Sequence, residues 1–197
     1  MTEIIKSNIN KSQEFLKIKD FDSAENCLMK NLEISNDNFE TFFLLGVING
    51  IKKKFNNAEV FLKKAINLNP NHINLNLNLA IILKKLNKID ESIKFFNNVI
   101  KLDQKNIEGL CGLAQIHGDK NKLDDAVKYF KEALKINPKH QIANHAYGKI
   151  LLKKQVEGYN VKIYLSKYDD LITYIIIGVV IGGRLGYVFF YNFDKIF

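Results

Sequence analysis

Hydrophobic residues over the first 155 positions recur mostly at intervals of three and four, which predicts amphipathic helices. In one such segment Ala58, Leu62 and Ala65 fall on a single helix face. From Leu171 to Phe193 the pattern changes to an apolar run that holds one charge, Arg184. The chain therefore divides into a part whose amphipathic pattern is typical of a water-soluble helical domain and a part whose apolar sequence is typical of a membrane segment.

The first part repeats itself every 34 residues. Pro70 and Pro138 lie 68 residues apart, twice that period, and the segments before them agree: AEVFLKKAINLNP (58–70) and AVKYFKEALKINP (126–138). A period of this length with two helices per unit is typical of a helical-hairpin array. We number each unit so that these prolines stand at position 32. The units are then 5–38, 39–72, 73–106, 107–140 and a partial unit 141–155.

Residue size at fixed positions explains how each hairpin closes. Small residues at positions 8, 20 and 27 let two helices approach closely, and large residues at positions 7 and 24 fill the remaining space. Position 32 ends the second helix where it is proline, because proline cannot donate a backbone hydrogen bond. In the unit 39–72 these positions are Leu45, Gly46, Ala58, Leu62 and Ala65.

This pattern resembles the tetratricopeptide repeat family over about residues 5–155. The resemblance implies an all-α fold, a tetratricopeptide helical-hairpin solenoid. Two stretches depart from it. Residues 73–79 alternate apolar and Asn with a strand's period of two, but the register and the helix-forming residues 80–86 favour a helix. Lys11 and Ser12 replace the expected Leu and Gly in the first unit, and we expect this polarity to suit an N-terminal cap.

The resemblance also implies a binding groove lined by the first helix of each unit. We expect it to hold a peptide or a partner protein, with apolar pockets for side chains and Lys or Asn contacts to backbone or carboxylates. The groove candidates are Phe43, Val47, Asn78, Ile81, Lys84, Lys85, Gln115, His145 and Lys149.

The net charge of +8 lies on the repeats and is carried by lysine, since Arg184 is the chain's single arginine. Proteins that recognise nucleic-acid sequences rely on arginine for bidentate contacts to bases and phosphates, so we expect no nucleic-acid partner. Acidic proteins or anionic lipids fit this charge better.

The repeats contain few residues that could act as catalytic groups or metal ligands. His72 and His140 share the last position of their units, so periodicity explains both. Cys27 and Cys111 fall within predicted helices and do not indicate a disulfide framework. We find no nucleophile with a base, no phosphate-binding loop and no metal-ligand spacing, and we therefore expect no catalytic residues, metal or cofactor in the repeats.

The apolar run 171–193 is long enough to cross roughly 30 Å of hydrocarbon as one transmembrane helix. It follows a predicted linker, 156–170. Lysines before the run, and the absence of a signal peptide, predict that the repeats are cytoplasmic. Gly178, Gly182 and Gly186 share one helix face and suit close helix packing.

The sequence GGRLGYVFFYNF (182–193) resembles a membrane segment of bacterial prolipoprotein diacylglyceryl transferase, over about residues 169–197. That family transfers a diacylglyceryl group from phosphatidylglycerol to a lipoprotein cysteine. The resemblance implies a helix-packing or lipid-phosphate-facing element, and the histidine of the family's HGG motif is missing from this chain. The residues of this helix-packing or lipid-phosphate-facing element are Gly178, Gly182, Gly183, Arg184 and Gly186.

Three interpretations stay open. The first is an interaction scaffold tethered to the bacterial inner membrane with its repeats in the cytoplasm, or a cytoplasmic one. The second is a truncated or fused diacylglyceryl transferase that is inactive alone. The third is a fusion or truncation product without a joint function. The sequence identifies neither the partner protein nor the oligomeric state.

Overall fold

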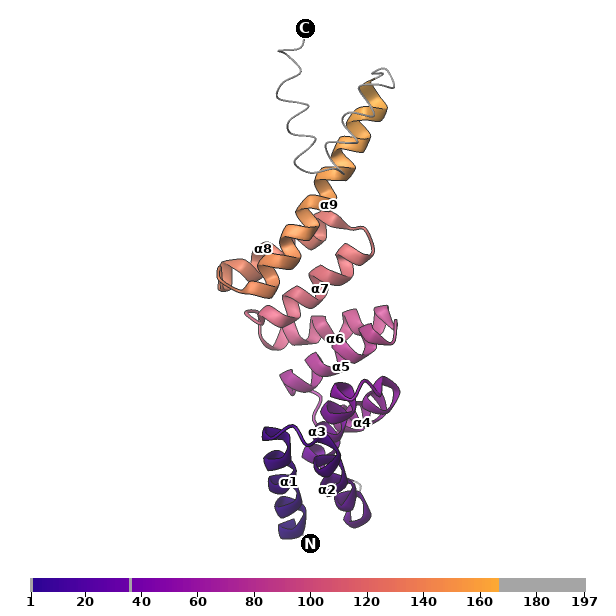
Figure 1. Ribbon diagram of the computed structural model, residues 1–197, viewed down its shortest axis with the longest axis vertical. Helices are drawn as coiled ribbons and strands as arrows, with labels where there is room; N and C mark the ends of the chain where they lie inside the picture. The colour runs from indigo at the N-terminus through magenta and orange to yellow at the C-terminus, as the bar shows by residue number, and fades with distance from the viewer. Residues whose placement is uncertain (1, 36, 167–197) are drawn as a thin grey trace. The chain divides into compact units, whose positions relative to one another are not determined.

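A computed structural model describes residues 2–35 and 37–166, and within those ranges all regular secondary structure is α-helical (Figure 1). This confirms the all-α prediction for the described part of the chain. The helices are α1 (Thr2–Lys17), α2 (Phe21–Ile34), α3 (Phe39–Ile51), α4 (Phe55–Leu68), α5 (Ile73–Lys85), α6 (Ile89–Leu102), α7 (Ile107–Asp119), α8 (Leu123–Ile136) and α9 (Gln141–Ser166).

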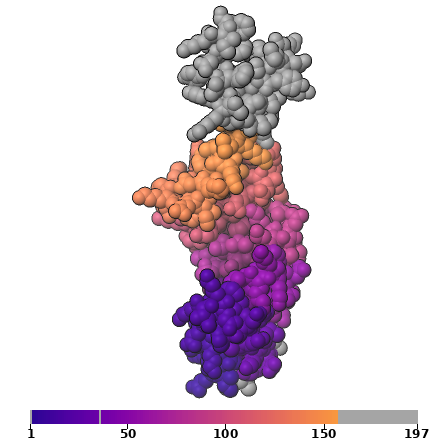
Figure 2. Space-filling model, viewed as in Figure 1, coloured from indigo at the N-terminus to yellow at the C-terminus, as the bar shows by residue number. Residues whose placement is uncertain are grey.

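Residues 1–144 form one compact unit built from four helical hairpins. Within it α1 packs on α2, α3 on α4, α5 on α6 and α7 on α8, which matches the four predicted repeats. The second helix of each hairpin also packs on the first helix of the next, and Figure 2 shows successive repeats following one another in sequence order. Because the first helices α3, α5 and α7 contact one another as well, they line the inner side of the stack.

The predicted core positions are buried. Leu45, Ala58, Leu62 and Ala65 are all fully shielded from solvent. A Cβ atom built on Gly46 would lie 2.5 Å from Cγ and Cδ2 of Leu62, so only glycine permits this approach of α3 to α4. The 34-residue register therefore predicts the hairpin packing correctly.

The ambiguous stretch 73–79 is the start of helix α5, as the register predicts. Leu75, Leu79 and Leu83 recur every four residues on one face and are fully buried. Asn76, also buried, donates from Nδ2 to the backbone oxygens of Pro70 and His72, at 2.7 and 3.0 Å. The alternation of Leu and Asn thus belongs to a helix whose asparagine binds the preceding loop.

The first repeat corrects one expectation. Ser12 does not serve a solvent-facing cap, because it is fully buried and its hydroxyl donates to Ile9 O at 2.7 Å. Asn31 takes the small-residue position 27 and is also fully buried. It donates from Nδ2 to Ile5 O and to Thr41 Oγ1, both at 3.2 Å. Buried polar groups are tolerated when they are hydrogen-bonded in this way.

The turns repeat with the same period as the core. Asn38, His72 and Asn106, at position 34, each accept a backbone N–H in the first turn of the following helix. Position 15 has a left-handed backbone in all four hairpins, and its residues are Lys19, Lys53, Asn87 and Asn121, with φ between 58° and 60°.

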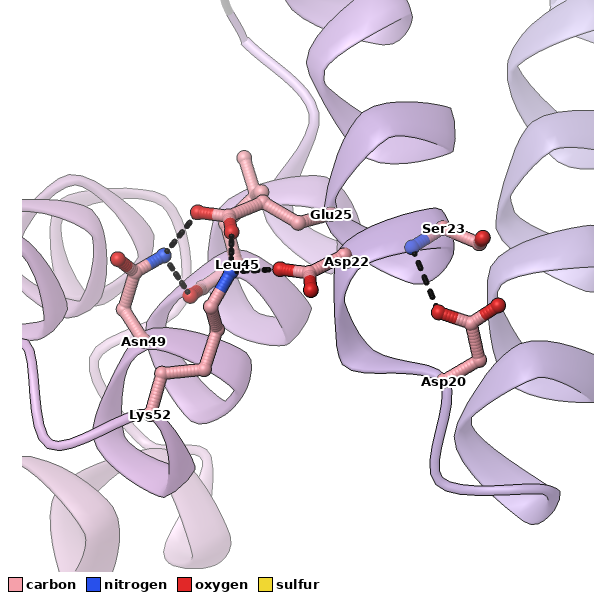
Figure 3. Close-up of polar contacts among 7 residues, drawn as sticks. All are labelled: Asp20, Asp22, Ser23, Glu25, Leu45, Asn49 and Lys52. Carbon is pink, nitrogen blue, oxygen red and sulfur yellow. Dashed lines mark hydrogen bonds and ion pairs between the residues drawn. The ribbon is translucent and has the colours of Figure 1, made fainter.

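Polar side chains connect the first two repeats (Figure 3). Lys52 Nζ at the end of α3 forms ion pairs with Asp22 and Glu25 of α2, and Asn49 Nδ2 donates to Glu25 Oε1 at 3.0 Å. Lys120 and Asp90, at the repeat positions of Lys52 and Asp22, pair at 3.2 Å. The same type of ion pair thus forms at two repeat junctions.

Helix α9 begins at Gln141 and is continuous through residues 156–166. This first part of the predicted linker is helical because it contains no proline and its one glycine, Gly158, costs only about 1 kcal/mol in a helix. The compact unit of the four hairpins ends at Asn144, and the boundary of the repeat array at residue 155 stays a prediction. Among the described residues no helix is both long and apolar enough to span a membrane, and the predicted transmembrane helix, 171–193, lies outside them.

Candidate functional site

A pocket of about 350 Å³ opens between α3 and α5, at the junction of the second and third repeats. Four of the predicted groove residues line it together: Val47, Asn78, Ile81 and Lys85. Other lining residues that shape it are Gly50, Ile51 and Lys53. We call this space the α3–α5 pocket. It lies on the side of the stack where first helices meet, as the groove prediction requires.

Gly50 keeps this pocket open. It stands at repeat position 12, where the preceding repeat has Leu16 and the following repeat has Lys84. A Cβ atom on Gly50 would lie 3.1 Å from Ile82 Cδ1, so any larger side chain there extends into the pocket. The absence of a side chain at Gly50 therefore distinguishes this junction from its two neighbours.

The pocket combines an apolar wall with a cationic rim. Ile51 and Ile81 are large aliphatic residues of the pocket lining that are 50% and 41% exposed, respectively. Lys53 and Lys85 are exposed and form no ion pair among the described residues. Asn78 donates from Nδ2 to Asn74 O at 2.8 Å, which leaves its Oδ1 atom as an acceptor. Such a surface can hold an aliphatic group next to an anion.

Two further predicted groove residues contact each other at the next junction. Lys84 Nζ of α5 donates to Gln115 Oε1 of α7 at 2.9 Å and lies 3.6 Å from Asp119 Oδ2. Burial lowers the pKa of Lys84, an effect that Asp119 opposes and Lys85 reinforces. Gln115 is the repeat equivalent of Ile81, so a side-chain bridge spans the place that is open beside Gly50.

Phe43 belongs to an aromatic cluster instead of the pocket. Its ring stacks on Phe39 at a centroid distance of 5.9 Å and lies 5.3 Å from the His72 ring. The two phenylalanines pack against the buried core of α3, α4 and α5. Phe43 therefore contributes mainly to the packing of the second repeat.

The remaining predicted residues cannot be related to the pocket. His145 and Lys149 are exposed residues of α9 in the second compact unit, which is described by itself. Gly178, Gly182, Gly183, Arg184 and Gly186 lie outside the described residues. The lipid-facing role that the sequence resemblance implies for them stays a prediction.

The sequence reasoning missed Gly50, Ile51 and Lys53. A usable signal existed, because position 12 changes from Leu16 to Gly50 to Lys84 over the first three repeats and is glycine again at Gly118. A position that loses its side chain on the groove side of one repeat indicates a cavity there.

The described residues offer little for catalysis. They contain no group of three or more His, Cys, Asp or Glu placed to hold a metal ion. Cys111 is buried in α7, and burial, with a smaller effect of Glu108, raises the pKa of its thiol to about 11. Its thiolate is therefore scarce at neutral pH. The exposed aliphatic and cationic groups of the pocket are suited to contact a ligand rather than to catalyse a reaction.

Stacked two-helix units of 34 residues define the class of helical-repeat solenoids. Family models described as tetratricopeptide repeat match residues 5–38, 52–116 and 107–140. The chain belongs to the tetratricopeptide repeat family.

Solved structures share this fold. A crystal structure of MamA protein has a TM-score of 0.72 at 20% identity and covers 83% of this chain and 90% of that chain. YrrB, described as a TPR protein with an unusual peptide-binding site, has a TM-score of 0.68 at 20% identity and covers 72% of this chain and 73% of that chain. At these identities the similarity establishes the fold alone.

A short stretch is similar to a different protein. Phosphatidylglycerol–prolipoprotein diacylglyceryl transferase of Rhodopseudomonas palustris is 45% identical over 49 residues, which are 24% of this chain and 17% of the transferase. The enzyme of Rickettsia typhi is 48% identical over 44 residues, again 17% of its length. The chain thus spans about a sixth of these curated relatives.

Proposed function

We propose that this protein is an interaction scaffold that binds a peptide segment of a partner protein in the α3–α5 pocket. The observation that best supports this proposal is the opening beside Gly50, where four groove residues implied by the family resemblance line one cavity. An aliphatic wall that is open to solvent gains free energy when a ligand covers it, roughly 25 cal/mol per Å² of apolar surface. First helices in contact with one another provide a fixed platform for an extended ligand.

A displayed library of random dodecapeptides, selected on the immobilised full chain, tests this proposal. Peptides that are enriched would then be measured by fluorescence anisotropy against the full chain and against Gly50→Lys, which introduces the side chain that the next repeat carries at this position. We expect the variant to bind at least tenfold more weakly. Asn98→Lys, on the exposed side of α6, is the matched control because it adds the same charge away from the pocket. Equal binding by Gly50→Lys and the unmodified chain would rule out the pocket.

We also propose that the segment 171–193 tethers the repeats to a membrane. Its support is the apolar sequence and the short similarity to a transferase that acts on phosphatidylglycerol, a membrane lipid. Val179→Asp with Val180→Asp should release the full chain from carbonate-washed membranes, since each aspartate at the centre of a membrane helix costs roughly 2.5–3.5 kcal/mol. Retention of this double variant in the membrane pellet, equal to that of the original chain, would contradict a tether formed by these residues.

The transferase similarity supports a second candidate, a diacylglyceryl transferase activity. The scaffold proposal expects no transfer of a diacylglyceryl group from phosphatidylglycerol to a lipoprotein peptide by the purified chain. Transfer that is lost in Arg184→Ala would favour the transferase interpretation, because Arg184 is the one charged residue within the apolar run 171–193.

A further inference from the structure

We infer that the α3–α5 pocket selects an acidic peptide segment in which an aliphatic side chain has Asp or Glu as a close neighbour in sequence. This inference rests on the proposed peptide-binding function and specifies the chemistry of its ligand. It combines three features of the pocket: an aliphatic wall, a rim with two lysines, and the hydrogen-bond acceptor Oδ1 of Asn78, which has no partner in the described part of the chain.

The wall determines the central side chain. Val47 and Ile51 come from α3, Ile81 comes from α5, and Gly50 leaves the space between them empty. Branched aliphatic groups on both sides fit a Leu, Ile, Val or Met side chain of the ligand. A polar side chain would lose its water contacts there without a matching hydrogen-bond partner on this wall.

The rim determines the charge beside that side chain. At the repeat junctions other lysines are neutralised within the protein: Lys52 pairs with Asp22 and Glu25, and Lys88 pairs with Glu59 at 2.7 Å. Lys53 and Lys85 border the pocket from two different segments, and neither pairs with a carboxylate in the described part of the chain. Two unpaired cations at one cavity favour an anionic ligand, and the net charge of +8 attracts it from a distance.

The open acceptor indicates a peptide rather than a small acid. Asn78 Nδ2 is used within α5, by Asn74 O, so the Oδ1 atom beside the pocket is available to a peptide N–H. An extended peptide alternates its side chains, so an aliphatic residue in the pocket places its sequence neighbours toward the rim. The neighbours of the anchor are therefore the residues that Lys53 and Lys85 can reach.

A charge-reversal selection tests the inference. The random dodecapeptide library, displayed with blocked C-termini, would be selected in parallel on the full chain, on Lys53→Glu with Lys85→Glu, and on Lys101→Glu with Lys135→Glu. The last variant makes the same change in net charge on exposed lysines of α6 and α8. Circular dichroism would establish that all three are folded. We expect the original chain and the control to enrich Asp or Glu within two residues of an aliphatic anchor, and the pocket reversal to enrich Lys or Arg there.

The outcomes separate this inference from the function on which it rests. Enriched peptides without acidic neighbours, or with neighbours unchanged by the pocket reversal, would overturn the inference and leave peptide binding intact. A selection that enriches the same peptides on Gly50→Lys as on the original chain would overturn the proposed function itself. For a selected peptide, changing its acidic neighbours to Gln or Asn should weaken binding about tenfold, and raising the salt concentration should reduce that difference.

Discussion

The side chain of Lys84 reaches from α5 to Gln115 on α7, with Nζ 2.9 Å from Oε1. One repeat earlier the equivalent residues are Gly50 and Ile81, which cannot form such a bridge. The pocket follows from this difference, because the helices at both junctions belong to the same repeat architecture. A glycine in place of lysine thus leaves a cavity at one repeat junction where the next junction has a side-chain contact.

Substituting alanine for each of the two glycines of α3 should change the free energy of unfolding in opposite directions. Gly46→Ala should lower the free energy of unfolding by about 1–3 kcal/mol, because its Cβ would lie 2.5 Å from the buried Leu62 side chain. Gly50→Ala should raise it by about 0.5 kcal/mol, because alanine favours the helix and the one close contact is the terminal methyl of Ile82. Urea denaturation of both variants checks this. Equal destabilisation by the two substitutions would mean that the space beside Gly50 is filled.

Replacing Lys19 with glycine should increase the stability of the protein. Its φ of 60° lies in the left-handed region, which costs a residue with a Cβ roughly 1–2 kcal/mol. Lys19→Gly should therefore raise the thermal midpoint, with a gain of about 1 kcal/mol. Asn121→Gly, at the same repeat position and the same φ, is the comparison and should gain less, since asparagine tolerates this conformation. A loss of stability in Lys19→Gly would show that its backbone conformation is not the limiting factor.

Acid should weaken the junction of the second and third repeats. Burial raises the pKa of Glu59, but hydrogen bonds from Lys63 and Lys88 lower it more, so the net pKa lies below its ordinary value of 4.5. A carboxyl group with a depressed folded-state pKa stabilises the fold above its unfolded pKa, and this contribution is lost as the pH falls through the folded value. We therefore expect stability to decline below about pH 5.

Glu59→Gln isolates that contribution. The variant should be less stable than the original chain at pH 7, and the difference between the two should shrink from pH 5 to pH 3, as urea midpoints at each pH would show. Glu14→Gln removes an exposed carboxylate that has no ion pair among the described residues, and serves as the control. A difference between Glu59→Gln and the original chain that stays constant with pH would contradict this account of the ion pair.

His72 should act as a helix cap that asparagine can replace. Its Nδ1 atom accepts the backbone N–H of Leu75 at 3.1 Å, as Asn38 and Asn106 do at the same position of other repeats. His72→Ala and His72→Asn both remove the ring contacts, so their difference reports the cap. Thermal denaturation should show His72→Asn to be more stable by about 1 kcal/mol. Equal stability of the two variants would argue against a capping role.

The register of the fold could be predicted because size and period determine it. Leu45, Ala58 and Leu62 are buried where the 34-residue pattern places them. The first repeat was harder to interpret, because Ser12 and Asn31 look solvent-exposed by type. Hydrogen bonds to partners that are distant in sequence, such as Ile5 O for Asn31, make their burial tolerable. Such partners are known only once the helices are packed.

The candidate site was predicted in part. Family positions identified Val47, Asn78, Ile81 and Lys85, but they also selected Phe43 and Lys84, whose side chains are engaged within the protein. The repeat position of a residue predicts the face of the helix on which it lies. It does not predict whether its side chain is already hydrogen-bonded or packed against a neighbouring residue. The opening at Gly50 arises from an absent side chain, which a search for functional groups overlooks.

Amide chemical-shift mapping of the full chain with a library-selected peptide tests the central claim most directly. The account predicts that the largest shifts fall on Val47, Gly50, Ile81 and Lys85, and that Gly50→Lys abolishes them. Shifts confined to the second helices α4, α6 and α8, with Gly50→Lys still responding, would contradict it.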